Sequence, residues 1–332
     1  AHPTMRELCY NSMFSGCTGL TQAPALPATT LAAGCYVSMF AGCTSLIKAP
    51  ALPATTLANM CYTDMFAGCT SLTQAPALPS TTLADMCYSG MFSGCTGLTQ
   101  APALPATTLV NGCYDSMFYN CTSLTQAPAL PVTTLAPSCY SGMFSDCTSL
   151  TQAPALPATT LASSCYYSMF WGCTTLTQAP TLPATTMAGA CYDSMFYGCT
   201  SLTQAPALPA TTLANGCYDS MFRGCTSLTF STTQTGEYIQ EYRIPSSGTG
   251  TTATDALRNM FGNTGGTFTG TPEINTTYYL SSDNMIVRET EIATLNGYVG
   301  SMIDGKAPTA ITNAKIDEIC GATILLAEDV PL

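Results

Sequence analysis

Cysteine is the residue type whose spacing in this sequence could support chemistry. The unit Cys-Tyr-x-x-Met-Phe-x-x-Cys-Thr recurs nine times with a step of 26 residues, and each copy carries two cysteines separated by seven residues. Three interpretations are open: a disulfide within each copy, two ladders of buried free thiols, or bridges between neighbouring copies. A disulfide that closes so short a loop would stabilise the chain by roughly 2.5 kcal/mol. It would also indicate an oxidising, extracellular environment.

The eighteen cysteines that are candidates for disulfide pairing within a copy are Cys9, Cys17, Cys35, Cys43, Cys61, Cys69, Cys87, Cys95, Cys113, Cys121, Cys139, Cys147, Cys165, Cys173, Cys191, Cys199, Cys217 and Cys225.

Metal binding and catalysis are poorly supported by the residue types present. Seven intervening residues are not the spacing of a zinc-binding Cys-x-x-Cys pair, and His2 is the single histidine of the chain. Nucleophile pairs that need histidine are therefore excluded. Asp193 and Asp219, in adjacent copies, are the least implausible carboxylate pair. Gly300–Lys306 fits part of a phosphate loop, but Pro308 blocks the helix that should follow. We predict that the chain is not an enzyme and has no cofactor or metal.

Composition limits the partners. The chain has 332 residues, only 8% of them charged, and a net charge of −11. Nucleic acid is disfavoured because phosphate binding needs clustered Lys and Arg. No apolar run approaches the roughly 18 residues of a membrane span. With 46% hydrophobic residues and few charges, we expect Thr, Ser, Gln and Tyr to form much of the solvent-exposed surface. The first residues align with the second half of a copy, which we interpret as a cut inside a longer protein.

The strict period predicts a solenoid in which each copy buries its apolar face against its neighbours. Within a copy we expect a short strand, as at Leu20–Ala23, and then a polyproline-like side, as at Pro24–Pro27. In Cys35–Cys43 the apolar residues recur at gaps of four, one and three, which favours a short helical or 3₁₀ turn. The predicted core is Leu, Cys, Met, Phe, Cys and Leu of each copy.

These positions resemble the BspA-like leucine-rich repeat family. The family's pattern is represented here by Cys35, Met39-Phe40, Gly42-Cys43, Ser45-Leu46 and Leu52-Pro53, and the resemblance covers about residues 1–229. Cys stands where the family usually has Ile, and Met where it has Ala. The resemblance implies an α/β leucine-rich-repeat-type solenoid of about nine coils. It often implies a surface adhesin of gut or oral bacteria, but no particular ligand.

Two columns of the repeat vary while the others hardly change. They lie two residues after the first Cys and one residue after Phe, four positions apart, so we expect them to share one outward face. Aromatic and charged residues gather there in the later copies and could contact a ligand. The alternative is that these are simply unconstrained solvent positions. The ligand-binding candidates are Asp115, Tyr119, Tyr167, Trp171, Asp193, Tyr197, Asp219 and Arg223.

The pattern breaks after the ninth copy. We divide the chain into a repeat domain at 1–229, a degenerate repeat and cap at 230–290, and a small C-terminal element at 291–332. Glu237–Ile244 is expected to be a strand. Ala256–Phe261 is interpreted as part of a tenth copy without cysteines, because repeat stacks need a polar terminal unit.

The leading hypothesis is a non-catalytic, adhesin-like module at the cell surface or outside the cell. It would present a repetitive face to a protein or glycan on a host or neighbouring cell. The alternative is a structural spacer or a bacteriophage virion fibre or decoration protein. This alternative rests on the uniformity of the copies and on a weak likeness of Thr312–Ile319 to tail segments of phage structural proteins.

Overall fold

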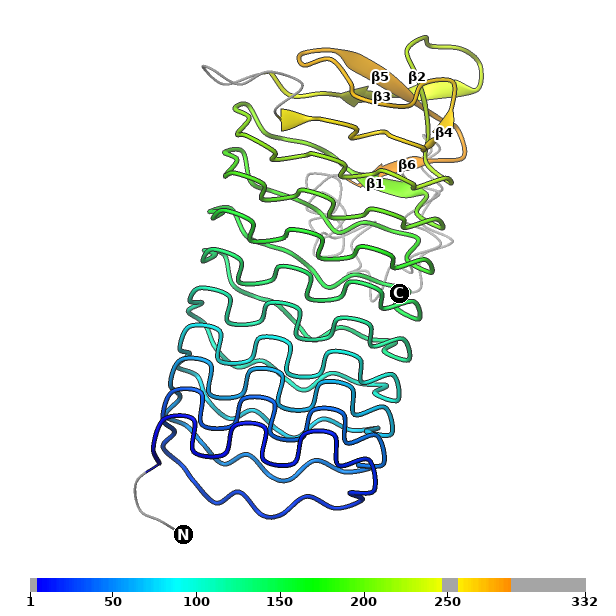
Figure 1. The fold of residues 1–332 in the computed structure, drawn as a ribbon. Helices are drawn as coiled ribbons and strands as arrows, with labels where there is room; N and C mark the ends of the chain where they lie inside the picture. The colour runs from blue at the N-terminus through cyan, green and yellow to red at the C-terminus, as the bar shows by residue number, and fades with distance from the viewer. Residues whose placement is uncertain (1–4, 247–255, 288–332) are drawn as a thin grey trace, which may run out of the picture. The chain divides into compact units, whose positions relative to one another are not determined.

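The computed structural model describes residues 5–246 and 256–287. The chain divides into two compact units, Ala1–Ile286 and Val287–Leu332. The expected C-terminal element at 291–332, the phosphate-loop-like segment and the phage-like segment all lie outside the described residues. Within the first unit, successive copies lie one above the next (Figure 1). We number the copies so that copy one contains Cys9.

The side of each copy that carries the two cysteines is a row of turns. The Tyr36 amide donates to the carbonyl of Cys61 in the next copy at 3.0 Å, and the Phe40 amide donates to that of Met65 at 2.9 Å. The amides between them donate three residues back, as Met39 does to Tyr36 at 3.2 Å. The expected helical turn is wrong, since residues 5–231 contain no helix. A helix would use its amides within one segment, whereas here every second amide bonds the next copy.

This alternation needs a left-handed residue at every fourth position. In copy two the φ angles are +58° at Gly34, +51° at Ser38 and +71° at Gly42. Glycine adopts this conformation without steric cost, whereas most side chains are strained there. Met60 nevertheless occupies a left-handed position, with φ of +57°.

The core is built from columns of identical residues. In copies two to nine both cysteines, Met, Phe and the following Leu are at most 2% exposed, as the predicted core requires. The expectation that Tyr faces water is wrong for the Tyr after the first Cys. From Tyr36 to Tyr218 this column is buried and its rings stack at 5.7–6.0 Å, beside a Phe column stacked at 5.6–5.8 Å. Stacked rings bury a large area and hold the copies in register.

The other sides of the copies are extended but pair only briefly. Gln22 bridges Lys48, and Thr30 bridges Thr56, both in parallel register. The expected strand after the second Cys is therefore mostly a single bridge per copy, because the proline that follows cannot donate to a ladder. In copy eight it lengthens to strand β1, Gln204–Pro206.

The residues after copy nine form a small sheet. Its strands are β2 (Thr229–Ser231), β3 (Tyr238–Arg243), β4 (Gly265–Gly266) and β5 (Thr277–Ser281), in the order β3-β5-β2-β4. β5 is antiparallel to β3 and β2, and β4 is parallel to β2. Strand β6, Met285–Val287, pairs with β1. The strand expected at Glu237–Ile244 is confirmed by β3.

The segment that begins at Ala256 pairs with copy nine as a further copy would. The Tyr218 amide donates to the carbonyl of Ala256 at 2.9 Å, so that Ala256 stands where a first cysteine would. On its far side the amide of Phe261 donates to the carbonyl of Gly270 at 2.8 Å. The amides of this last layer are thus partly paired within the chain, which blunts the open edge.

We expect substitutions at left-handed positions to change stability in opposite directions. Met60→Asn should stabilise the chain by roughly 0.5–1 kcal/mol, because Asn tolerates a positive φ and the Met side chain is already 42% exposed. Gly94→Ala, at φ of +70°, should destabilise it by about 1 kcal/mol, since its Cβ meets only ordinary contacts and the cost is conformational. Urea denaturation of each variant measures this. As a control, Ala67→Gly, outside the left-handed positions, should destabilise. Stabilisation by this control, or destabilisation by Met60→Asn, would contradict the analysis.

Candidate functional site

Three of the predicted ligand-binding residues form one continuous row. Trp171, Tyr197 and Arg223 follow the buried Phe of copies seven, eight and nine. The Trp171 and Tyr197 rings meet edge to face, with centroids 5.6 Å apart and planes at 86°. The guanidinium carbon of Arg223 lies 5.5 Å from the centre of the Tyr197 ring, a cation–π contact. Trp171 is 43% exposed. We call these three residues the aromatic row.

The backbone fixes the spacing of the aromatic row. Each member precedes a left-handed glycine, and the Gly172 amide donates to the Tyr197 carbonyl at 2.7 Å. The Gly198 amide likewise donates to the Arg223 carbonyl at 2.7 Å. A Cβ built on Gly198 would lie 3.9 Å from Gly172 Cα. Gly198 therefore stacks on Gly172 backbone on backbone, with no side chain between them.

Two other predicted aromatics are exposed but are not members of the row. Tyr119 is 39% exposed in copy five. Between it and Trp171 lies copy six, where the same column holds Ser145, which is buried. Tyr167, 42% exposed, belongs to the other variable column of copy seven. The predicted set is therefore not one continuous aromatic surface.

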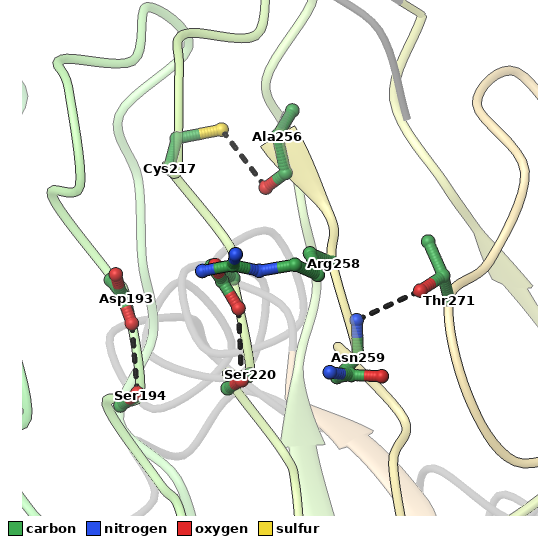
Figure 2. A network of polar contacts seen from close by, with 9 residues as sticks. Asp193, Ser194, Cys217, Ser220, Ala256, Arg258, Asn259 and Thr271 are labelled. Carbon is green, nitrogen blue, oxygen red and sulfur yellow. Dashed lines mark hydrogen bonds and ion pairs between the residues drawn. The ribbon is translucent and has the colours of Figure 1, made fainter. Parts of the chain in front are cut away.

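The predicted carboxylates are partly engaged within the chain. Asp219 is buried and accepts from Arg258, whose Nη2 lies 2.6 Å and whose Nε lies 2.8 Å from Oδ2. Asp193, in the preceding copy, accepts from the Ser194 hydroxyl at 2.8 Å (Figure 2). Asp219 thus contributes an ion pair that joins copy nine to the layer beginning at Ala256.

Burial changes the acidity of two of these carboxyls. It raises the pKa of Asp193 to about 6, while the Ser194 hydrogen bond opposes the rise and the charge of Asp219 adds to it. The cation of Arg258 lowers the pKa of Asp193 slightly. Burial also raises the pKa of Asp115, against a hydrogen bond from Ser116. Partial withdrawal from water disfavours the charged form in both cases.

Asp146 is a polar residue of this face that sequence reasoning missed. A Cβ built on Gly172 would collide with its Oδ1, so the carboxylate lies over Gly172, next in sequence to Trp171. Within the described residues its carboxylate makes no hydrogen bond or ion pair. The signal was available, because Asp146 and Asn120 stand in a left-handed column that otherwise holds glycine.

The predicted disulfides, Cys9 with Cys17 through Cys217 with Cys225, are not formed, and all eighteen described cysteines are free. The second cysteine of a copy instead donates its thiol to the preceding copy. Cys147 Sγ lies 3.1 Å from the Phe118 carbonyl oxygen. Each thiol is thus directed along the stack toward the neighbouring copy, where it satisfies a backbone acceptor.

These buried thiols are chemically quiet. Burial raises the pKa of Cys35 to about 11 and that of Cys61 to about 12. Such thiols stay protonated at neutral pH, and it is the thiolate that attacks electrophiles and binds metals. Among residues 5–246 and 256–287 no group of three or more His, Cys, Asp or Glu side chains is placed to hold a metal ion. The cysteine ladders are packing elements in this structure.

Comparison with known proteins gives a family match. The model of the BspA type leucine rich repeat region matches six times, over residues 9–151, 64–203 and 114–247. A solved structure of a leucine rich cell surface protein from Faecalibacterium prausnitzii is similar at 17% identity with a TM-score of 0.38. The match covers 66% of this chain and 62% of that one, so the chain spans less than two thirds of the length of that protein. No curated protein matches. The described part of the chain contains no helix long and apolar enough to cross a membrane.

Thiol labelling tests the free cysteine ladders. Cys9 and Cys17 are exposed, whereas the other sixteen described cysteines are buried. In the folded chain an alkylating reagent should modify Cys9 and Cys17 first. In denaturant without reductant, all eighteen should react. Peptide mapping by mass spectrometry identifies the modified residues. Repeat cysteines that react only after reduction would show that disulfides form after all.

The raised pKa of Asp193 predicts a pH-dependent stability. A carboxyl whose pKa is higher in the folded state stabilises that state at low pH, and this contribution is lost as the pH rises through about 6. Asp193→Asn should therefore match the parent near pH 4 and be more stable above pH 6, by about 1 kcal/mol after allowance for solvent screening. Thermal unfolding from pH 4 to pH 8 measures the difference. Asp85→Asn, at an exposed position, is the matched control. Equal stability of Asp193→Asn and the parent at pH 8 would refute the expectation.

Proposed function

This chain belongs to the BspA-type leucine-rich repeat family, and we propose on that basis that it is a non-catalytic, solenoid-type binding module displayed outside the cell. Its ligand would be a protein or glycan on a host or neighbouring cell. Family membership supports the repeat architecture. The aromatic row supports the binding role.

The observation that carries the proposal is the packing of Trp171, Tyr197 and Arg223. Tryptophan, tyrosine and arginine are the residue types that most often dominate binding energy at interfaces. Here they are neighbours in one column, linked by an edge-to-face contact and a cation–π contact. Trp171 keeps 43% of its surface exposed, whereas the Tyr166 and Phe170 rings of the same copy are buried. Exposed aromatic residues grouped with such neighbours are typical of contact surfaces, which supports the binding role.

The mechanism would be passive recognition on a rigid support. The row is mounted on backbone that is hydrogen bonded from copy to copy, and the Phe residues beneath it stack at 5.7–5.8 Å. Little side-chain and backbone freedom remains to be lost when a ligand binds. Pre-organisation of this kind raises affinity by reducing the entropic cost of association.

The alternative is a structural spacer or a virion fibre. The uniformity of the copies favours it, because a spacer needs only a regular stack. Under this alternative the exposed aromatics are unconstrained solvent positions and contribute nothing to binding. The two functions differ in whether changing the aromatic row has any effect outside the chain.

We expect Trp171→Ala and Tyr197→Ala each to weaken adhesion by tenfold or more, since loss of a hot-spot residue costs at least about 1.4 kcal/mol. The measurement is binding of the labelled chain to mucin-coated surfaces and to epithelial cells, with circular dichroism to verify folding. Ile239→Ala is the matched control, because Ile239 is 49% exposed on β3 and lies outside the row. Binding that is unaffected by both substitutions, or no binding at all, would favour the spacer.

A further inference from the structure

Arg223 is a basic residue of the repeats that contacts an aromatic ring and has no carboxylate partner among the described residues. The described part of the chain contains one ion pair, between Arg258 and Asp219. Asp219 lies four residues before Arg223 and would be the nearest counter-ion in sequence, but Arg258 occupies it. Arg223 instead lies over the Tyr197 ring with no carboxylate partner among the described residues. In a chain of net charge −11, this is a cation left available to an external anion.

A carboxylate lies at the other end of the row. Asp146 in copy six extends over Gly172, beside Trp171, and its side chain has no hydrogen-bond partner among the described residues. From copy six to copy nine the polar and aromatic groups therefore follow in the order acid, indole, phenol, guanidinium. Three steps of the stack at strand spacing cover roughly 15 Å, enough for a short extended ligand.

We propose that the row binds an acidic oligosaccharide. A carboxylate of the sugar pairs with Arg223, a sugar ring packs on the exposed Trp171 indole, and a hydroxyl donates to Asp146. Arginine suits the first contact because its planar donors match a carboxylate. The carboxylate of Asp146 can only accept, which suits a hydroxyl donor. This inference rests on the proposed binding function and specifies the class of its ligand.

The surroundings of the row favour a glycan over a protein partner. A stable protein interface buries about 800 Å² on each side around an apolar centre. Here the aromatic surface is small, since Trp171 and Tyr167 of copy seven are exposed and Tyr197 of copy eight is half-buried. The columns beside them hold small residues, namely the left-handed glycines Gly172 and Gly198 and the serines Ser168 and Ser194. An exposed indole and a half-buried phenol among small residues leave room for a hydroxylated ligand but offer no extended apolar surface.

The test uses the full chain and intrinsic fluorescence, because Trp171 is its only tryptophan. The probes are oligogalacturonate, hyaluronan oligosaccharides and polysialic acid, each compared with its carboxyl-reduced, neutral counterpart. At least one acidic probe should change the fluorescence in a saturable way and bind tenfold or more tightly than its neutral form, the range of a charge-assisted hydrogen bond. Added salt should weaken that binding.

Affinities of single variants, measured by isothermal titration calorimetry, test each proposed contact separately. Arg223→Gln should lose roughly tenfold in affinity for the acidic probe and bind the neutral form unchanged, whereas Arg6→Gln, which removes the same charge from copy one, should bind as the parent does. Asp146→Ala should weaken the binding of both the acidic and the neutral form of the probe.

Equal affinity for acidic and neutral forms would overturn the charge assignment and leave the binding function intact. If no glycan binds while Trp171→Ala still abolishes adhesion to cells, the ligand is a protein and the inference fails. If adhesion is also independent of Trp171, the proposed function fails with it.

Discussion

The structure depends on how each copy divides its backbone amides. On the cysteine-bearing side, alternate amides bond the next copy and the others close turns within their own copy. This division is possible only if the backbone reverses handedness regularly, so every fourth residue is left-handed. The arrangement satisfies the buried peptide groups without helix or continuous strand, as burial requires. It also sets identical side chains above one another, and the columns follow from it.

The stacking of identical residues in columns explains the second cysteine of each copy better than disulfide formation does. The Phe14 carbonyl accepts from the Cys17 amide at 3.0 Å and from the Cys43 thiol of the next copy at 3.1 Å. A cysteine at the second position is small enough for the crowded core and still donates a weak hydrogen bond along the stack. An aliphatic residue would fill the space without that bond. A disulfide within the copy would direct the sulfur away from the carbonyl. The proposed location outside the cell therefore rests on family membership and not on the redox state of the cysteines.

Much of the fold was predictable, because a strict period reveals which positions are equivalent. The 26-residue step, the Cys, Met, Phe and Leu core and strand β3 could be found from the sequence. The turn row was missed because gaps of four, one and three between apolar residues fit one face of a helix equally well. The signal that distinguishes them is the recurrence of Gly, Ser, Asn and Asp every fourth residue, as at Gly34, Ser38 and Gly42, where a left-handed backbone is needed. The buried Tyr column was missed because the phenol hydroxyl suggested a side chain exposed to solvent.

In the site, the adjacency of Trp171 and Tyr197 could be predicted from the repeat period. The contact between Asp219 and Arg258 could not, because it crosses the insertion that interrupts the repeat.

The position of the aromatic row near the last copy also has a physical basis. Copy one has a described neighbour on one side only, and its Met13 is 57% exposed, whereas Met221 at the same place in copy nine is fully buried. Copies seven to nine are held on both sides, and the Arg258 ion pair fixes the layer that follows copy nine. The same ion pair engages Asp219, the carboxylate that stands four residues before Arg223 in the sequence. Arg258 thus joins the layer that begins at Ala256 to copy nine, and Arg223 keeps its contact with the Tyr197 ring and no carboxylate partner among the described residues.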